Sequence, residues 1–265
     1  IMDSPEEAKF GMTKAQLIQA FKDLKTVGVK KFGIHALLAS NTITNCYYPE
    51  LARQLFELAV EIVAETDVDL DFINLSGGVG VPYHPEEKAN DILAIGQGVR
   101  QAYEEILEPV GLGKVKIFTE LGRFMLAPHG LLVTKVLHKK QTYRTYIGLD
   151  ASAVNLLRPA MYGAYHHITN MDHPDGQTEI VDVVGGLCEN NDKFAIQREL
   201  PITNIGDTLV IHDTGAHGFS MGYQYNGKLR SAELLLEEDG GVRLIRRAEI
   251  PEDYFATLYG FDFEK

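Results

Sequence analysis

Residues 70–80 read LDFINLSGGVG, and this segment indicates the fold class. Its first part, Leu70–Leu75, has the length and apolar composition of a buried strand, and its second part is a glycine-rich turn. Helical periodicity flanks it at 49–65 and 86–108, where apolar residues recur at spacings of three and four. A strand between two such helices is typical of the βα units that build a parallel sheet.

Two further units have the same pattern. Their apolar runs are Lys31–Leu38, which follows a helical stretch at 13–27, and Val115–Glu120. Three parallel strands alone would leave long unpaired edges. Because a (β/α)8 barrel has eight units, we expect residues 1–128 to be a partial barrel containing the last three, with about five more supplied upstream of residue 1 or by another chain.

From about residue 130 the pattern changes to short β-type runs broken by Gly, Asp and Asn, at 131–137, 142–150, 178–186, 207–213 and 241–250. They predict an antiparallel β domain over residues 129–265, closed by a short helix at 252–258. The expected fold class is therefore α/β plus β, namely the C-terminal part of a (β/α)8 barrel followed by an antiparallel β domain.

Composition narrows the possible partners. The formal net charge is -12, and no long Lys/Arg run is present, so we expect neither nucleic acid nor an anionic membrane as a partner. No apolar run is long enough to cross a bilayer, and residues 1–12 lack the order of a signal peptide, which favours a cytoplasmic protein. Cys46 and Cys188 match neither a disulfide framework nor a metal motif, and we expect no metal. A small charged metabolite fits better.

Residues that could bind a ligand or take part in catalysis follow the predicted strands. Ser76–Gly80 offers backbone N–H groups to an anion such as a phosphate, and Glu120-Leu121-Gly122-Arg123 places a carboxylate and a guanidinium beside a glycine. The first strand ends in Leu38–Asn41. One glycine-rich turn alone is more often a tight connection. Two on the same face of a barrel favour a phosphate site.

The β half has two further candidates. Arg158 and Tyr162 lie four residues apart and could bind a carboxylate through a guanidinium and a hydroxyl, although such an arginine is more often a surface ion-pair partner. Cys188 lies beside Glu189 in a glycine-containing turn. A lone cysteine is most often a small buried hydrophobe, and its reactivity depends on its surroundings.

Six segments together resemble the ordered motifs of the diaminopimelate decarboxylases, which are fold-type III pyridoxal-phosphate enzymes. They are SGGVGVPY (76–83), ELGR (120–123), NLLRPAMYGAYH (155–166), GGLCENND (185–192), DTGAHGFSMGYQYN (213–226) and SAELLL (231–236). The resemblance implies pyridoxal 5'-phosphate as cofactor and the decarboxylation of meso-diaminopimelate to L-lysine and carbon dioxide, in lysine biosynthesis. It also implies a homodimer with shared active sites.

The resemblance also implies roles for individual residues. Glu120 would face the pyridine nitrogen, and Cys188 would be the proton donor, acting in the site of the partner subunit. The distal carboxylate of the substrate would be bound by Arg123, Arg158 and Tyr162, and Glu189 would recognise the amino group at the D-configured centre. The cofactor-binding set would be Ser40, Gly77, Gly78, Glu120, Leu121, Gly122, Arg123 and His217. Leu121 replaces a proline of the family, a change that keeps the backbone amide.

Three positions depart from the family pattern. Leu37 replaces a histidine that stacks on the cofactor ring, and His217 replaces a tyrosine that contacts cofactor and substrate. The Schiff-base lysine of the family lies on an early barrel strand, in a Lys-Ala-Asn motif. We reject Lys88-Ala89-Asn90 as that motif, because Pro85 and the acidic residues after it predict a loop and a helix start. We expect the lysine upstream of residue 1, so that residues 1–265 alone are not catalytically complete.

Two other interpretations stay open. A related decarboxylase could act on carboxynorspermidine or another basic amino acid, and the chain could instead be a non-catalytic regulatory homologue. An arginine pair suits ornithine poorly, because ornithine lacks a distal carboxylate. A non-catalytic homologue has no chemical need to keep all five of the residues that the motifs retain, which are Glu120, Arg123, Arg158, Cys188 and Glu189.

The placement of the lysine can be tested by absorbance. The full-length protein loaded with pyridoxal phosphate should show the Schiff-base band, and the 265-residue chain alone should not, with intact mass checking both samples. A stable band in the short chain would show that the lysine placement is wrong.

Overall fold

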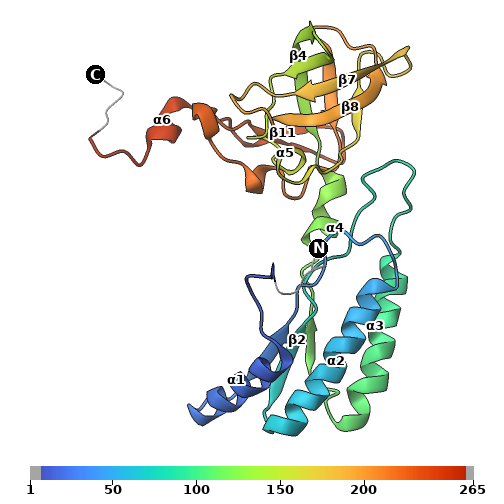
Figure 1. The fold of residues 1–265 in the computed structure, drawn as a ribbon, viewed down its shortest axis with the longest axis vertical. Coiled ribbons are helices and arrows are strands. Elements are labelled where there is room, and N and C mark those ends of the chain that lie inside the picture. Colours follow the sequence, from blue (N-terminus) through green and yellow to red (C-terminus); the bar gives the residue numbers. More distant parts are fainter. Residues whose placement is uncertain (1–6, 261–265) are drawn as a thin grey trace. The chain divides into compact units, whose positions relative to one another are not determined.

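The computed structural model describes residues 7–260, which form two compact units. Unit 1 contains residues 7–82 and 86–126, and unit 2 contains residues 83–85 and 127–260 (Figure 1). Within the described residues, no helix combines the length and the apolar composition that a membrane-spanning helix needs.

Unit 1 is built on a parallel three-stranded sheet, as the sequence predicted. Its strands lie in the order β1 (Phe32–His35), β2 (Leu70–Asn74) and β3 (Lys116–Phe118). The register pairs His35 with Asn74 and Asn74 with Phe118, so the carboxyl ends of all three strands are level. The loops that follow the strands therefore begin at one edge of the sheet.

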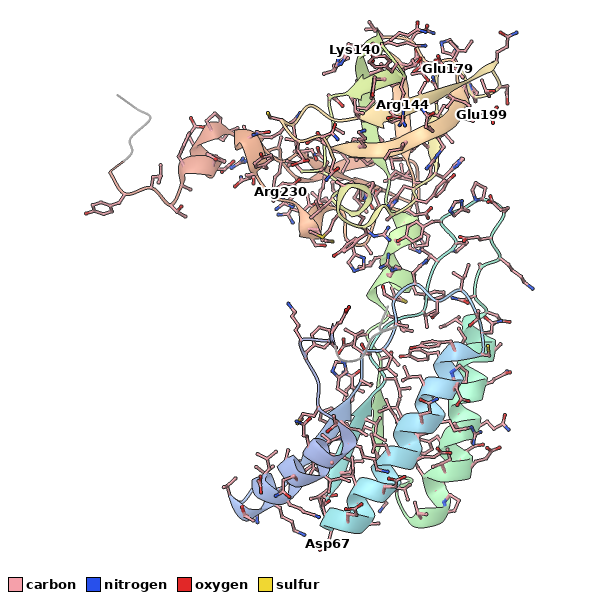
Figure 2. All side chains as sticks on the ribbon, in the orientation of Figure 1. Asp67, Lys140, Arg144, Glu179, Glu199 and Arg230 are labelled. Carbon is pink, nitrogen blue, oxygen red and sulfur yellow. The ribbon has the colours of Figure 1, made fainter. Side chains whose placement is uncertain are left out.

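Three helices accompany this sheet, α1 (Lys14–Thr26), α2 (Tyr47–Thr66) and α3 (Ile92–Ile106). The buried face of α2 repeats at spacings of three and four, through Leu51, Leu55, Ala59 and Ile62. These residues share one core with the strand residues Ile34 and Ile73. Helix α2 ends at Thr66, and the next residue, Asp67, labelled in Figure 2, caps it with a left-handed φ of 49° and donates its N–H to Val63 O.

The predicted start of α3 at residue 86 is wrong. The helix begins at Ile92, because the Asp91 carboxylate caps it by accepting from the N–H groups of Leu93 at 3.0 Å and Ala94 at 3.1 Å. Residues 86–91 form a loop, in which Asn90 donates its side-chain amide to Thr42 O and Gly80 O. Lys88 is exposed in this loop and does not lie on a strand.

Shorter helical segments follow. They are η2 (Glu108–Val110), α4 (Gly122–Leu126) and η3 (Ala127–His129), of which η3 belongs to unit 2. Helix α4 starts two residues after Glu120, so the ELGR segment consists of the end of the turn after β3 and the first two residues of this helix.

Unit 2 is built on a six-stranded sheet with the order β6-β9-β4-β5-β7-β8. The strands are β4 (Leu132–Gln141), β5 (Thr145–Leu149), β6 (Ile168–Asn170), β7 (Thr178–Val184), β8 (Lys193–Pro201) and β9 (Thr208–Ile211). Its core includes Ile147, Val181, Val183, Leu209 and Ile211, all fully buried. A separate hairpin joins β10 (Glu233–Leu236) to β11 (Val242–Arg246).

The prediction of an antiparallel sheet is wrong at one place, because β5 and β7 pair in parallel. The connection between them is long, residues 150–177, and contains α5 (Arg158–Tyr162) and β6. A connection of this length can return the chain to the same end of the sheet, which a short hairpin cannot do. The remaining pairs of this sheet are antiparallel.

Strand β8 was missed, and the closing helix is shorter than expected. The residues of β8 include the helix formers Gln197, Arg198 and Glu199, and a bulge at Gln197, with φ 49°, breaks the alternation of the strand. The buried Asp182 carboxylate accepts from the N–H of Gln197 at 2.8 Å and pairs with Arg144, labelled in Figure 2. Helix α6 spans Pro251–Phe255 instead of 252–258. Two more short helical turns are η4 (Phe219–Met221) and η5 (Tyr225–Gly227).

Gly130 lies against the backbone of a distant loop in unit 2. A Cβ atom at this position would lie 2.3 Å from both Cα and N of Gly215. Hydrogen bonds hold the two segments together, from Thr214 N to Gly130 O at 2.9 Å and from Gly215 N to Ala127 O at 3.1 Å. This contact fixes the start of the loop that contains His217.

We expect Gly130→Ala to destabilise unit 2 by about 1–3 kcal/mol, because the added methyl group overlaps backbone atoms that cannot move independently. The measurement is the midpoint of thermal or denaturant unfolding. Gly176→Ala is the matched control, since its nearest neighbour would lie at an ordinary 3.7 Å. Equal midpoints for the two variants would contradict the expectation.

Candidate active site

Asn74 connects two of the loops at the carboxyl edge of the sheet in unit 1. Its side-chain amide donates to Glu120 Oε1 at 2.7 Å, and its Oδ1 accepts from the N–H of Ser76 at 2.8 Å. The N–H of Glu120 donates to Ser76 O at 2.7 Å. One side chain at the end of β2 thus orients the Glu120 carboxylate and fixes the first residue of the glycine-rich loop.

Two other residues surround Glu120. His35, at the end of β1, has its Nε2 3.9 Å from Glu120 Oε1, and the two side chains are 48% and 57% exposed. The Glu120 carboxylate is therefore accessible to a ligand. The Tyr48 hydroxyl donates to Ser76 O at 2.8 Å, and burial, helped by the charge of Glu120, raises the pKa of Tyr48, so that this donor keeps its proton.

The glycine-rich loop contacts its neighbours through backbone atoms. A Cβ atom on Gly77 would lie 2.7 Å from Glu120 O, and one on Gly78 would lie 3.1 Å from Ala39 O. Gly78 also has a φ of 109°, which L-residues rarely adopt. The N–H of Thr42 donates to Gly78 O at 2.9 Å. The loops after all three strands therefore pack backbone to backbone, and only glycine fits at 77 and 78.

The same edge carries N–H groups that can bind an anion. Within residues 7–260, the amides of Gly77, Gly78 and Leu121 donate no hydrogen bond to the protein. Arg123 donates from Nη2 to Ser40 Oγ at 3.0 Å, which joins the loop after β1 to the ELGR turn. The structure thus brings together the predicted cofactor residues of unit 1. Backbone amides beside a guanidinium have the chemistry that a phosphate group requires, so these residues fit the phosphate of pyridoxal 5'-phosphate.

Leu37 lies in the loop after β1, and its side chain is 43% exposed, as is that of Leu38 at 44%. Two exposed leucines next to a polar cluster give this loop an apolar surface that water does not favour. Packing of Leu37 on a cofactor ring stays a prediction.

In unit 2, the two residues predicted to bind a carboxylate together have different environments. Arg158 and Tyr162 are the first and last residues of α5. The Arg158 side chain is buried, with 8% exposed, whereas Tyr162 is 65% exposed. Their joint action on one carboxylate stays a prediction.

The turn that carries Cys188 and Glu189 is fixed by residues that the sequence reasoning missed. The N–H of Cys188 donates to Asn226 Oδ1 at 2.7 Å, and the N–H of Leu187 donates to Asp192 Oδ2 at 2.8 Å. Asp192 is only 3% exposed, and its Oδ1 accepts from the N–H of Ala153 at 2.7 Å. Asp192 therefore connects this turn to the segment that leads into α5. Asp192 ends the segment GGLCENND, and Asn226 ends DTGAHGFSMGYQYN. A polar residue at the end of a glycine-containing segment was the sequence signal that could have indicated these two anchors.

The Cys188 side chain is exposed, as is Glu189, whose Oε1 accepts from the N–H of Asn191 at 2.9 Å. Tyr223 lies near the same turn. Burial, with the charges of Asp192 and Glu189, raises the pKa of the Tyr223 hydroxyl, which keeps it a hydrogen-bond donor. A thiol, a carboxylate and a phenol are thus grouped at one turn of unit 2.

His217 lies in a backbone-strained loop. Both His217 and Asp213 have a φ of 58°, a left-handed conformation that costs a non-glycine residue about 1–3 kcal/mol. Burial raises the pKa of the Asp213 carboxyl, against the opposing effect of His212 and His167. Strain of this kind occurs at ligand-binding loops, although the contact of His217 with the cofactor stays a prediction.

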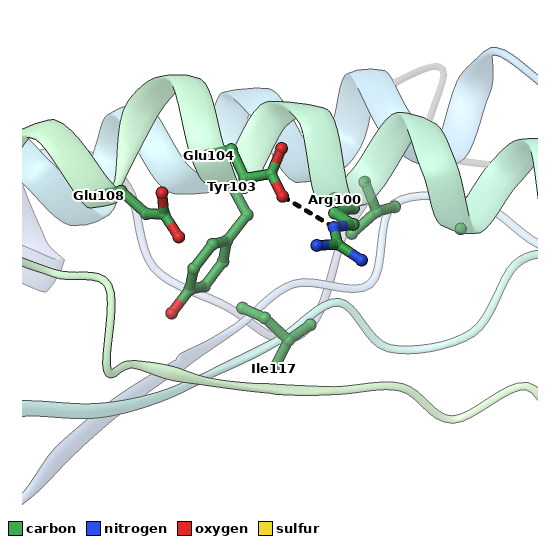
Figure 3. A pocket seen from close by; sticks show the side chains of 7 residues that line it. Arg100, Tyr103, Glu104, Glu108 and Ile117 are labelled. Atoms are coloured by element: carbon green, nitrogen blue, oxygen red, sulfur yellow. Dashed lines mark hydrogen bonds and ion pairs between the residues drawn. The ribbon is translucent and has the colours of Figure 1, made fainter.

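A hollow of about 340 Å³ in unit 1 contains none of the predicted residues. It lies beside α3, and Figure 3 shows Arg100, paired with Glu104, and Tyr103 next to Ile117. Ile117 belongs to β3, an edge strand of the sheet. We assign this hollow to the open edge of the sheet and not to the candidate active site.

Asp192 gives a direct test of how the Cys188 turn is held. Asp192→Asn replaces one of two buried acceptor oxygens by an NH2 group that faces a backbone N–H. We expect a loss of about 1–3 kcal/mol of unfolding free energy, measured by denaturant titration. Asp175→Asn, at an exposed position, is the control and should leave the midpoint unchanged. A midpoint of Asp192→Asn equal to wild type would rule out the anchoring role.

Comparison with known proteins supports the resemblance. The family model described as pyridoxal-dependent decarboxylase, C-terminal sheet domain, matches residues 29–215. Protein TabA of Pseudomonas amygdali pv. tabaci is 41% identical over 97% of this chain and 60% of its own length. The diaminopimelate decarboxylase of Methanothermobacter thermautotrophicus is 36% identical over 94% of this chain and 58% of its own length.

A solved structure agrees with these matches. The crystal structure of diaminopimelate decarboxylase from Helicobacter pylori complexed with L-lysine is similar with a TM-score of 0.80 and 30% identity, covering 95% of this chain and 60% of that one. This chain thus spans about 60% of the length of the relatives it matches. The predicted resemblance is confirmed: the chain belongs to the family of pyridoxal-dependent decarboxylases.

Proposed function

We propose that the complete protein is a diaminopimelate decarboxylase, which converts meso-diaminopimelate to L-lysine and carbon dioxide in lysine biosynthesis. Residues 1–128 would be the last three units of its (β/α)8 barrel, and residues 129–265 its β domain. The observation that carries the proposal is the turn with the consecutive residues Cys188 and Glu189, whose backbone N–H groups are fixed by the side chains of Asp192 and Asn226. Relatives named diaminopimelate decarboxylase support the choice of substrate.

Unit 1 would bind the cofactor. The free amides of Gly77, Gly78 and Leu121, with Arg123 and Ser40, would hold its phosphate, and Gly122 lies between Leu121 and Arg123 in the same segment. Glu120, oriented by Asn74, would accept a hydrogen bond from the ring nitrogen. When bound, pyridoxal phosphate supplies an electron sink for the pair of electrons that departing carbon dioxide leaves.

Unit 2 would act on the substrate. Arg158 and Tyr162, with Arg123 of unit 1, would bind the distal carboxylate, and Glu189 would bind the amino group of the D-configured centre. The Cys188 thiol would donate a proton to the carbon that has lost its carboxylate. In a homodimer, as the family resemblance implies, this thiol would serve the site of the second copy.

The proposal is tested on the complete polypeptide loaded with pyridoxal phosphate. We expect carbon dioxide and L-lysine from meso-diaminopimelate. Carboxynorspermidine and ornithine are assayed in parallel, since TabA, a relative at 41% identity, has a name that specifies no reaction. Activity on either of these without activity on meso-diaminopimelate would contradict the proposed substrate. No turnover of any substrate by cofactor-loaded protein would favour a regulatory homologue.

Cys188 and Cys46 provide a matched pair of variants. We expect Cys188→Ala to lower kcat about 10²- to 10⁴-fold, the usual contribution of a positioned proton donor, while the cofactor absorbance is kept. Cys46 is also exposed, makes no side-chain capping bond at the start of α2, and among the described residues its thiol has one hydrogen bond, to Thr44 Oγ1 at 3.7 Å. Cys46→Ala should therefore match wild type in steady-state kinetics. Equal kcat values for the two variants would remove Cys188 from the mechanism.

A further inference from the structure

A buried histidine, His166, connects Arg158 to the end of β9. His166 is fully buried, with 0% exposed, and Arg158 is 8% exposed. Arg158 Nη1 lies 2.7 Å from His166 Nε2, and His166 Nδ1 lies 2.8 Å from the backbone oxygen of His212. The imidazole thus joins the guanidinium to a backbone carbonyl through its two nitrogens.

The chemistry of the two partners determines the protonation of this ring. A backbone carbonyl only accepts, so His166 Nδ1 carries the hydrogen. A guanidinium only donates, so Nε2 has the free lone pair. His166 is therefore the neutral Nδ1–H tautomer. A neutral acceptor orients the guanidinium without cancelling its charge, which a carboxylate in the same place would do.

Tyr83 limits the remaining freedom of Arg158. The guanidinium carbon lies 4.5 Å from the centre of the Tyr83 ring, and the rings of Tyr83 and His166 meet edge to face at 5.0 Å. Tyr83 is itself 5% exposed. The backbone of His166 is held by Arg198, whose Nη1 donates to its carbonyl at 3.0 Å. A ring face and a ring nitrogen together define both the plane and the direction of the guanidinium.

We propose that His166 is a positioning residue, which with Tyr83 directs the Arg158 guanidinium toward the distal carboxylate of the substrate. This inference rests on the proposed function, because it takes Arg158 as the group that binds that carboxylate. His166 and Tyr83 lie in segments that matched family motifs, but neither was assigned a role from the sequence. Their role would be in affinity for one end of the substrate and not in the chemical step.

Two variants of His166 separate its two hydrogen bonds. In His166→Gln the side-chain amide reaches the position of Nε2, so an oxygen can still accept from Arg158. In His166→Asn the amide lies at the position of Nδ1, so the bond to His212 O can form while the contact of Arg158 Nη1 with residue 166 is lost. Each variant keeps one hydrogen bond of the buried side chain. The two variants differ in whether residue 166 still accepts from Arg158.

L-Lysine and cadaverine are the probes, because they differ only in the carboxylate that L-lysine carries. Both are measured as competitive inhibitors and by calorimetry on the full-length protein loaded with pyridoxal phosphate. We expect His166→Asn to weaken L-lysine about tenfold and His166→Gln by less than about threefold, which is the scale of one hydrogen bond to a charged group. Cadaverine should bind both variants as it binds wild type. KM for meso-diaminopimelate should follow the L-lysine result, with kcat little changed.

Two outcomes would overturn the inference. One is an equal loss of L-lysine affinity in both variants, and the other is a parallel loss for cadaverine, which would indicate a purely structural role. If His166→Asn does not fold, Tyr83→Leu and Tyr83→Phe replace the pair, with the selective loss expected in the leucine variant alone. Wild-type protein that neither converts meso-diaminopimelate nor prefers L-lysine to cadaverine would overturn the proposed function itself.

Discussion

The contact between Gly77 and the carbonyl of Glu120 is the constraint on which the site in unit 1 depends. Because Gly77 has no side chain, the loops after β2 and β3 come close enough for Ser76 O to accept from the N–H of Glu120. That approach places a carboxylate next to amides with no partner in the described part of the chain. A methyl group at residue 77 would push the two loops apart and so move the Glu120 carboxylate away from these amides.

Much of unit 1 could be predicted from the sequence, because its elements are long and periodic. The apolar run at 70–75 indicates a strand, and the spacing of Leu51, Leu55 and Ile62 indicates a helix with one buried face. The ends of the predicted strands then locate the loops that carry the candidate residues. The loop before α3 could not be predicted in the same way, since the Asn90 side chain donates to two distant carbonyls, although Asp91 is a local signal for the start of the helix itself. Asn74 was missed for the same reason: its two bonds join residues that only the folded sheet brings together.

Unit 2 was less predictable, because its strands are short and irregular. Strand β8 contains helix formers and a bulge, and its register is set by the buried Asp182, which is remote in sequence. Motif resemblance identified Cys188, Glu189 and Arg158, but their supports needed the structure. Asp192 and His166 bind through specific atoms to segments 39 and 46 residues away, and no local pattern reports such bonds.

The parallel pairing of β5 with β7 has a consequence for the order of folding. Hairpins such as β7 with β8 close short loops, whereas the β5–β7 pair must enclose the whole of residues 150–177 before any contact repays the lost chain entropy. Arg158 and His166 both lie inside that enclosed segment. The segment that carries Arg158 is therefore expected to become ordered late, after the rest of the sheet has formed around it.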